Sequence, residues 1–488
     1  MKSPLFDPNA IKTDYTTPKM TRSLSKEQLR YEAHSPFMTL LEMSVGPLIY
    51  MLGIAIHDAI DLLLISKAFT ETEVTIVGFA TTIRYLCMSV AIYFSQACVA
   101  KTSALIGADR FSFAAQVTAD LYRLAFVSSI IIPVIFYFIS DPLLRFMGCT
   151  PAMSKEACSY LIPILCLMPL ISTFQLSCGT LQSEGRSILS GLMQLTAFAL
   201  NCGVFGPALL FGLKIPFKYA GFSFAISQAL PGIVLSLLIF SGKLNDYIKW
   251  GNLVKKPIKE TYDSLKIASP YILNVIAGVF PPLILINLMM NAASKQGITQ
   301  YCGPVYSIFL KLQPLVNCFS ISFGQGMLGT GSYAHGSGND NRLLHIYYST
   351  FGLTLIFQLV LLPIIVFFPR YVAKIWLRDS KSLDLSVKML PIPFYTNWTT
   401  AINESVTALL QCLSYSKTAI SPSLTRGAFY IIYSFAIYYL TNKDDCVKMM
   451  YVYCANDLTI LLLDLIIWIK PIRKLTRKKP NTDSMASV

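Results

Sequence analysis

Long apolar stretches separated by short polar connections run through almost the whole chain. Each stretch holds about 20 residues with few charged side chains, which is the length that a helix needs to cross a bilayer core of about 30 Å. Twelve stretches fit this description, so the pattern predicts an all-α integral membrane protein with twelve transmembrane helices. We place them at residues 37–66, 74–100, 114–139, 157–181, 187–213, 219–240, 264–292, 299–330, 343–369, 385–413, 417–441 and 447–470.

Proline and glycine interrupt several of these stretches. In lipid, a broken helix survives only where a neighbouring helix or a water-lined cavity satisfies the freed backbone groups. The interruptions therefore favour a solute pathway over a simple anchor, although kinks in packed helices explain a share of them. The residues concerned are Gly53, Pro163, Pro207, Pro231, Pro281, Pro282 and Pro391.

The longest polar connection, residues 241–262, divides the stretches into two groups of six. A shift of 229 residues places Gln96 on Gln325, Ser103 on Ser332, Gly107 on Gly336 and Gln182 on Gln411. We interpret this as an internal duplication, which puts a binding site near the bilayer midplane between the halves. The predicted organisation is an N-terminal tail at 1–36, an N-terminal lobe at 37–240, a linker at 241–262, a C-terminal lobe at 263–470 and a basic tail at 471–488.

Composition and charge exclude several classes of protein. Hydrophobic residues make up 54% of the chain and charged residues 14%, which excludes a soluble enzyme and a disordered chain. The 12 cysteines lie mostly inside apolar stretches, which excludes a secreted disulfide scaffold. The net charge of +14 lies in connections and tails beside the stretches, a pattern typical of contact with anionic lipid rather than nucleic acid.

The distribution of Lys and Arg predicts the orientation. About 22 lie on the two tails and the even-numbered connections, and about 13 on the odd-numbered connections. Basic residues favour the cytoplasmic side, so we expect both termini in the cytoplasm, in a plasma or organelle membrane.

The order of short motifs resembles that of the multidrug and toxic compound extrusion (MATE) family. Residues 47–110, with PLIYMLGIAIHDAIDLLLISKAF, VGFATT and TSALIGADR, are similar to the opening of that family. Later matches in the family's order lie at 180–187, 200–214, 219–228 and 323–341. The resemblance covers about residues 37–470. It implies a secondary antiporter, not an enzyme, that exports small organic, cationic or amphipathic solutes in exchange for H⁺ or Na⁺, with no cofactor besides that ion.

The chain also departs from the family pattern. In the fifth stretch Asn201 is present, but Phe205 or Gly206 stands where the family has Asp, and the seventh stretch contains no carboxylate. These departures leave the coupling ion open. The stretch IGADRFSFA is also similar to a turn of major facilitator transporters, and lipid-linked-oligosaccharide flippases have a related fold. Both stay as alternatives, as does a non-transport receptor or scramblase.

Two acidic residues, Asp58 and Asp61, lie inside the first stretch, with His57 one helical turn before Asp61. An ionised Asp at such a depth is costly unless it faces a partner or a cavity, so it is a functional hypothesis by default. By the resemblance, Asp61 takes the place of the family acid and Asp58 that of an Asn. The alternative is that the span ends early and both carboxylates lie among the headgroups.

The tenth stretch contains one carboxylate, Glu404. If both lobes bind coupling ions, Glu404 is the acid of the C-terminal lobe, and a helix-packing role is the alternative. We favour coupling in the N-terminal lobe, around Asp61 and Asn201. Arg84 and Lys311 occupy nearly corresponding positions of the second and eighth stretches, where pairing with Asp61 or Glu404, or snorkelling to an interface, explains them.

A cavity for an organic cation needs polar or aromatic walls, because aromatic faces attract cations. We expect a monomer with a small-molecule substrate in the lipid bilayer, and no nucleic-acid partner. The sequence contains no G-x-x-x-x-G-K-[ST] motif, which argues against nucleotide-driven transport, and its His and Cys spacing predicts no metal site. The substrate-cavity candidates are His57, Tyr85, Tyr93, Gln182, Phe280 and Tyr306.

Overall fold

The computed structural model describes residues 25–147, 149–377 and 379–477, which form helices and turns and no strand. In the N-terminal half, a short helix α1 (Lys26–Glu32) precedes six spanning units. The units are α2 (Pro36–Ala68), α3 (Glu71–Gly107), α4 (Phe111–Phe146), the pair α5 (Pro151–Cys166) and α6 (Met168–Ser183), α7 (Ser187–Leu200) with the π turns Asn201–Phe205 and Ala208–Gly212, and α8 (Phe222–Phe240).

The C-terminal half repeats this number of units after a linker that contains a 3-10 turn at Trp250–Leu253. The units are α9 (Lys259–Lys295), α10 (Thr299–Gly336), α11 (Asp340–Phe367), the broken group α12 (Pro369–Lys374), α13 (Ser380–Met389), α14 (Pro391–Phe394) and α15 (Thr399–Cys412), then α16 (Ser416–Leu440) and α17 (Tyr451–Arg477).

Each of the twelve predicted stretches coincides with one of these units, so the predicted all-α fold with twelve spanning helices is confirmed. Within the described residues, eight units meet a test of length and apolar composition for a membrane span. The α5–α6 pair, bent by 57°, makes a ninth if it is one span. The other three, α10, the α12–α15 group and α16, carry more polar residues or are broken into shorter helices.

The proline interruptions have two outcomes. Pro163 lies inside α5, which ends only at Cys166. At Pro391 the preceding helix α13 has ended, because proline lacks the N–H that continues the hydrogen-bond ladder. By contrast, α8 continues through Pro231, and α9 continues through Pro281 and Pro282. The latter prolines are therefore positions inside packed helices, as the alternative interpretation of the sequence held.

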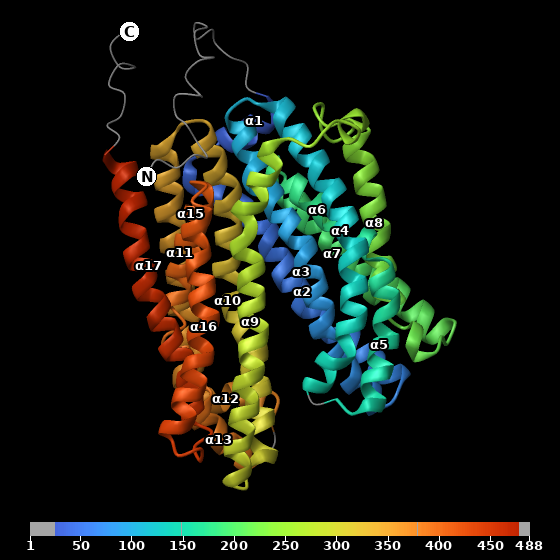
Figure 1. Ribbon diagram of the computed structural model, residues 1–488, viewed down its shortest axis with the longest axis vertical. Helices are drawn as coiled ribbons and strands as arrows, with labels where there is room; N and C mark the ends of the chain where they lie inside the picture. Colours follow the sequence, from blue (N-terminus) through green and yellow to red (C-terminus); the bar gives the residue numbers. More distant parts are fainter. Residues whose placement is uncertain (1–24, 148, 378, 478–488) are drawn as a thin grey trace, which may run out of the picture.

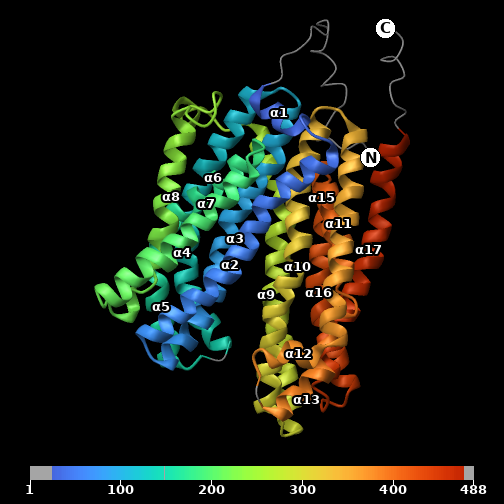
Figure 2. The same cartoon turned by 180° about the vertical axis from the view of Figure 1, so that it is seen from behind.

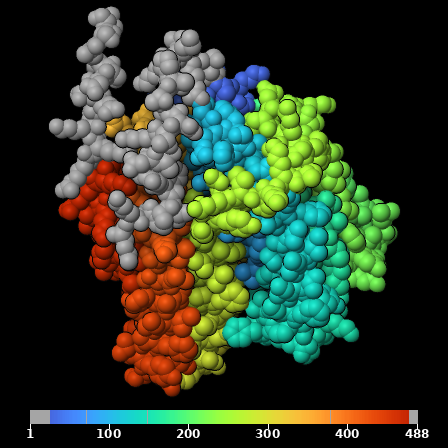
Figure 3. All heavy atoms as spheres, turned by 45° about the horizontal axis from the view of Figure 1, so that its top comes forward, coloured from blue at the N-terminus to red at the C-terminus, as the bar shows by residue number. Residues whose placement is uncertain are grey.

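The two groups of six units form two lobes, which we call the N-lobe (α2–α8) and the C-lobe (α9–α17). Figures 1 and 2 show the lobes side by side, touching at one end and diverging towards the other. Between the lobes α2 and α3 pack against α10, and α3 also packs against α9. In the space-filling view of Figure 3, the yellow α9 lies between the orange C-lobe and the teal N-lobe.

We call the end where the lobes touch the closed end; it holds α1 and the turns 108–110, 184–186, 337–339 and 413–415. These turns support the predicted duplication, because the shift of 229 residues relates them in pairs. Asp109 (φ 63°) and Gly338 (φ 76°) form one pair in the left-handed region, and Gly185 (φ 78°) and Ser414 (φ 57°) form the other. Equivalent turns thus share the left-handed backbone conformation, which few residues other than glycine adopt.

The two glycines that the shift also relates, Gly107 on α3 and Gly336 on α10, face each other across the lobe interface. A Cβ on Gly107 would lie 2.3 Å from the carbonyl oxygen of Tyr333, and a Cβ on Gly336 would lie 2.0 Å from that of Ala104. Each glycine thus meets the residue three positions before the other, as a two-fold relation between lobes requires. Only glycine permits so close an approach of the two helices.

Candidate functional site

The first predicted span brings three polar side chains together on α2. His57 and Asp61 lie one turn apart on the same helix face, and Asp58 follows His57. His57 is 2% exposed and Asp61 is 6% exposed, whereas the Asp58 side chain is 28% exposed. The α2 helix continues seven residues beyond Asp61, which is about 10 Å. All three residues therefore lie within an uninterrupted helix.

Arg84 on α3 lies opposite these carboxylates and is 3% exposed. Its Nη2 donates to Asp58 Oδ1 at 2.9 Å, and its Nη1 lies 3.9 Å from Asp61 Oδ2. The guanidinium carbon also lies 4.4 Å from the ring centroid of Phe224 on α8, which is within cation–π range. Of the two partners predicted for Arg84, the structure brings Asp61 near it, but the closer partner is Asp58, which the prediction did not name.

Asn201 joins the cluster from the first π turn, at the point where α7 changes its hydrogen-bond pattern. Its Nδ2 lies 2.8 Å from His57 Nε2 and donates to Asp61 Oδ1 at 3.1 Å. Because Asn201 donates to Nε2, a neutral His57 carries its proton on Nδ1, which lies 3.1 Å from Asp58 Oδ1. Single-turn π segments occur often at functional sites. Here the π turn that follows α7 brings Asn201 into contact with His57 and Asp61.

We call His57, Asp58, Asp61, Arg84 and Asn201 the N-lobe cluster. Asp58 is the better compensated carboxylate, because it receives hydrogen bonds from Arg84 and from the hydroxyl of Tyr85 and also contacts His57. Within the described residues, Asp61 accepts one hydrogen bond, from Asn201. The negative charge of Asp61 is thus the less stabilised of the two.

The other substrate-cavity candidates do not gather around this cluster. The hydroxyl of Tyr93 donates to the carbonyl of Leu265 across the lobe interface at 2.8 Å, and Gln182 donates across it to the carbonyl of Gln325 at 3.3 Å. Phe280 is 42% exposed on α9. Tyr306 is 1% exposed in the C-lobe core, where its hydroxyl lies 3.0 Å from that of Tyr453.

A second polar group lies in the C-lobe around Arg426 on α16, which the sequence interpretation missed. Arg426 donates to Asn403 Oδ1 at 3.1 Å, and Asn403 donates to Asp464 Oδ2 at 3.0 Å. Glu404 and Asp457 also lie within electrostatic range of Arg426. A basic residue in the interior of the eleventh apolar stretch was the sequence signal that could have found this group. The exposed Lys311 makes no salt bridge within the described part of the chain.

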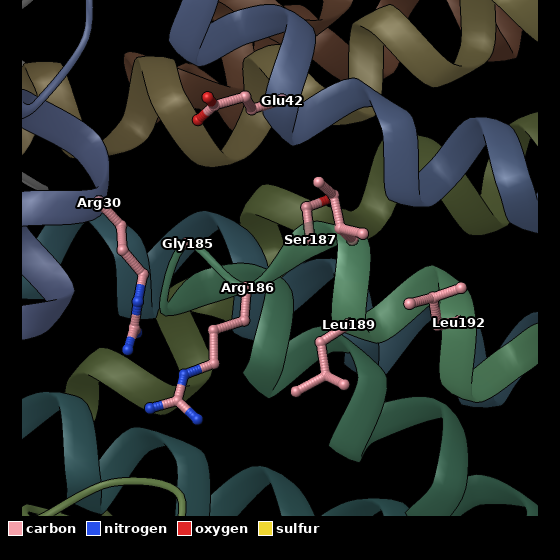
Figure 4. Close-up of a pocket in the computed structure, with 8 residues that line it drawn as sticks. Arg30, Glu42, Gly185, Arg186, Ser187, Leu189 and Leu192 are labelled. Carbon is pink, nitrogen blue, oxygen red and sulfur yellow. The ribbon is translucent and has the colours of Figure 1, made fainter.

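A groove of about 360 Å³ lies apart from both groups, at the closed end between α2 and the start of α7. Figure 4 shows Arg30 and Arg186 extending to the same side of it, with Glu42 on the opposite wall and Leu189 and Leu192 along α7. Arg186 donates to the carbonyl of Leu244 at 2.5 Å and Arg30 to that of Glu184 at 2.9 Å. These guanidiniums therefore fasten the linker and α1 to the N-lobe.

The sequence profile of the MatE family matches residues 48–204 and 304–435, which is more than half of the chain. The chain belongs to the MatE family. Both matched segments carry residues of the polar groups, since the first contains the whole N-lobe cluster and the second contains Glu404 and Arg426. Membership makes this MatE protein a multi-pass membrane transporter of small molecules and not an enzyme. The major facilitator and receptor alternatives are therefore set aside.

Solved structures agree with this MatE assignment in fold. An outward-facing multidrug resistance MATE transporter of the MOP superfamily has 14% identity and a TM-score of 0.83, covering 94% of this chain and 100% of its own. A MOP superfamily transporter from Pyrococcus furiosus Vc1 (DSM3638), with a binding pocket described as reversed in polarity, has 14% identity and a TM-score of 0.81, covering 93% and 99%. A MATE protein in complex with MaL6 has 15% identity and a TM-score of 0.79, covering 93% and 99%. Among curated proteins, the sequence search gave no match.

Proposed function

We propose that this MatE transporter is a secondary antiporter that exports small organic cations or amphipathic solutes in exchange for H⁺ or Na⁺. The observation that carries the proposal is the N-lobe cluster, in which two carboxylates from one helix share a single buried guanidinium. Charged side chains inside a membrane are rare unless they serve an ion pathway. The cluster is therefore the kind of site at which a transporter binds and releases its driving ion.

The charge of the cluster supports one exchangeable cation. With His57 neutral, the positive Arg84 offsets one of the two carboxylates, and one net negative charge is left. Among the described residues, Asp61 is the less closely paired carboxylate, since Arg84 Nη1 is 3.9 Å from its Oδ2 and Asn201 is neutral. Binding one H⁺ or Na⁺ at Asp61 would neutralise the cluster, so we assign ion coupling to Asp61 and Asn201.

Asp58 and Arg84 have a different proposed role in the same cluster. Their 2.9 Å contact, with Tyr85 and His57 on the same carboxylate, offsets the charge of Asp58 and fixes the Arg84 side chain beside Asp61. Asp58 is also the more exposed acid, so it is the member of the pair that a cationic solute in the space between lobes would meet first.

The C-lobe group supports a secondary role for Glu404. One Arg426 faces three carboxylates there, and Asp464 is fully buried against Asn403. Such a set holds helices together through hydrogen bonds when its acids are neutral. We therefore keep ion coupling in the N-lobe and expect Glu404 to affect substrate affinity at most.

The orientation follows from the distribution of basic residues. With both tails in the cytoplasm, the closed end faces the cytoplasm and the lobes diverge towards the opposite side. In this arrangement the partly exposed Asp58 is reached from the side to which substrate is released. We propose that the functional unit is a monomer, because one chain supplies both of the lobes that pack against each other through α2, α3, α9 and α10.

The test is transport of ethidium into everted vesicles, with a pH gradient and a Na⁺ gradient imposed separately. We expect one of the two gradients to drive uptake, and Asp61→Asn to reduce gradient-driven uptake at least about tenfold, because the neutral amide cannot exchange an ion. Asp246→Asn, which removes an exposed linker carboxylate, is the matched control and should be fully active. Uptake that neither gradient drives, or an unchanged Asp61→Asn, would refute the proposal.

A further inference from the structure

The short helix α1 lies across the closed end, before the first span (Figure 1). Its sequence favours a helix locally, because Ser25 and Gln28 form a reciprocal capping box at its N-terminus, with contacts of 3.2 and 3.0 Å. Three residues separate the end of α1 at Glu32 from the start of α2 at Pro36. Because so short a connection tethers α1 to α2, α1 belongs to the N-lobe by covalent attachment.

Side chains of α1 fasten it to the N-lobe at two turns. Gln28 donates to the carbonyl of Ile106 at 3.2 Å and to Asp109 Oδ1 at 2.7 Å, at the turn after α3. The hydroxyl of Tyr31 lies 3.1 Å from the carbonyl of Gln182 and 2.9 Å from that of Ser183, at the end of α6. This hydroxyl is buried, so its contacts are protected from water.

The other side of α1 contacts the C-lobe. The ring of Tyr31 stacks on that of Tyr333 on α10, with centroids 4.4 Å apart and planes 12° from parallel. The hydroxyl of Tyr333 donates to Glu32 Oε1 at 2.6 Å. Both tyrosines are 1% exposed. The ring stack between α1 and the C-lobe is therefore as buried as a protein core.

Arg342 on α11 of the C-lobe adds a charged anchor. It donates to the carbonyl of Tyr31, to the carbonyl of His34 at 3.0 Å and to the hydroxyl of Thr39 at 3.0 Å. The carbonyls lie at the end of α1 and just beyond it, and Thr39 lies in the first turns of α2. One guanidinium of the C-lobe thus holds the N-lobe segment from Tyr31 to Thr39.

We propose that α1 is an interlobe strap, which stabilises the state in which the lobes touch at the closed end. The inference rests on the proposed export function, because a solute that leaves the cytoplasm must enter between the lobes at this end, and the lobes must separate here to admit it. When they separate, α1 stays with the N-lobe, and the contacts of Tyr333 and Arg342 must break. Contacts present in one state and absent from the other shift the equilibrium between them, so the strap favours the closed end and slows its opening.

Hydrogen–deuterium exchange of the purified transporter in nanodiscs, with no gradient, tests the strap. The informative peptides are 97–107 at the end of α3 and 327–336 at the end of α10, which face each other across the lobes. Arg342→Gln removes all three anchoring contacts, and we expect exchange in both peptides to rise about fivefold or more, the lower range of coupling between sites. Tyr333→Phe keeps the ring stack and loses the hydroxyl contact, so it should produce a smaller rise in the same peptides.

The matched control is Arg370→Gln on α12, since Arg370 is an exposed arginine paired with the exposed Asp384 at 3.4 Å. It should leave exchange in both peptides unchanged. The strap is refuted if Arg342→Gln and Tyr333→Phe leave peptides 97–107 and 327–336 unchanged, or if exchange rises only in α1 itself. This result does not depend on the antiport proposal, because no ion gradient enters the measurement. Conversely, if neither gradient drives uptake by the wild-type protein, the exchange result still stands.

Discussion

Glu184, in the turn between α6 and α7 at the closed end, gives a prediction whose size follows from the structure. The residue is 0% exposed. Tyr247 of the linker donates to its Oε1 at 2.9 Å, and Oε2 has no hydrogen-bond partner among the described residues. Burial raises the pKa of this carboxyl from 4.5 to about 8, although Tyr247, Arg186 and Arg30 act in the opposite direction.

This shift makes stability depend on pH with a definite sign. Between pH 4.5 and about 8 the native state holds a proton on Glu184 that the unfolded state has released. The native state therefore binds more protons, and the free energy of unfolding falls as pH rises, by about 1.4 kcal/mol per pH unit. Glu184→Gln keeps an oxygen for Tyr247 and removes the titration. Relative to the variant, wild type should thus lose about 4 kcal/mol between pH 5 and pH 8.

Thermal unfolding of both proteins in one detergent, followed by tryptophan fluorescence from pH 5 to pH 8.5, measures this difference. The melting temperatures should be closest at pH 5, and the variant should become progressively more stable than wild type up to about pH 8. Glu156→Gln, which removes an exposed glutamate of α5, should follow wild type throughout. Parallel curves for wild type and Glu184→Gln would refute the assignment of a buried, protonated carboxyl.

Three further predictions concern coupling, the lobe contact and topology. Glu404→Gln should retain gradient-driven ethidium uptake, and the double variant with Asp61→Asn should be no worse than Asp61→Asn alone; a tenfold loss in Glu404→Gln would place a coupling acid in the C-lobe. Gly336→Ala should increase deuterium exchange at residues 97–107, because its Cβ would lie 2.0 Å from the carbonyl of Ala104; unchanged exchange would mean that the helices separate at no cost. A tag after Val488 should stay inaccessible to an impermeant label on intact cells, and labelling without permeabilisation would contradict the proposed orientation.

The sequence and the structure agree most closely on features set by local pattern. Apolar length alone located all twelve spanning units, because a helix must cover the bilayer wherever it crosses. The shift of 229 residues identified Gly107 and Gly336, and the structure adds left-handed turns at Asp109 and Gly338 that obey the same shift. Asp58 and Asp61 stood out because charge is rare in apolar stretches.

The partners of those charges were decided by how the helices cross. Arg84 lies 26 residues from Asp58 and Asn201 lies 140 residues from Asp61 along the chain, so no local pattern pairs them. The resemblance to the MATE family had grouped Asp61 with Asn201, but it gave no contact between them. Arg426 meets Asn403 for the same reason, and Tyr306, a cavity candidate by composition, lies in the C-lobe core. The clearest case is α1, which the polar pattern assigned to a cytoplasmic tail. Its capping box can be recognised in the sequence. The contacts of Gln28 with the N-lobe and of Arg342 on the C-lobe with Tyr31 form only when both lobes are folded and touch each other.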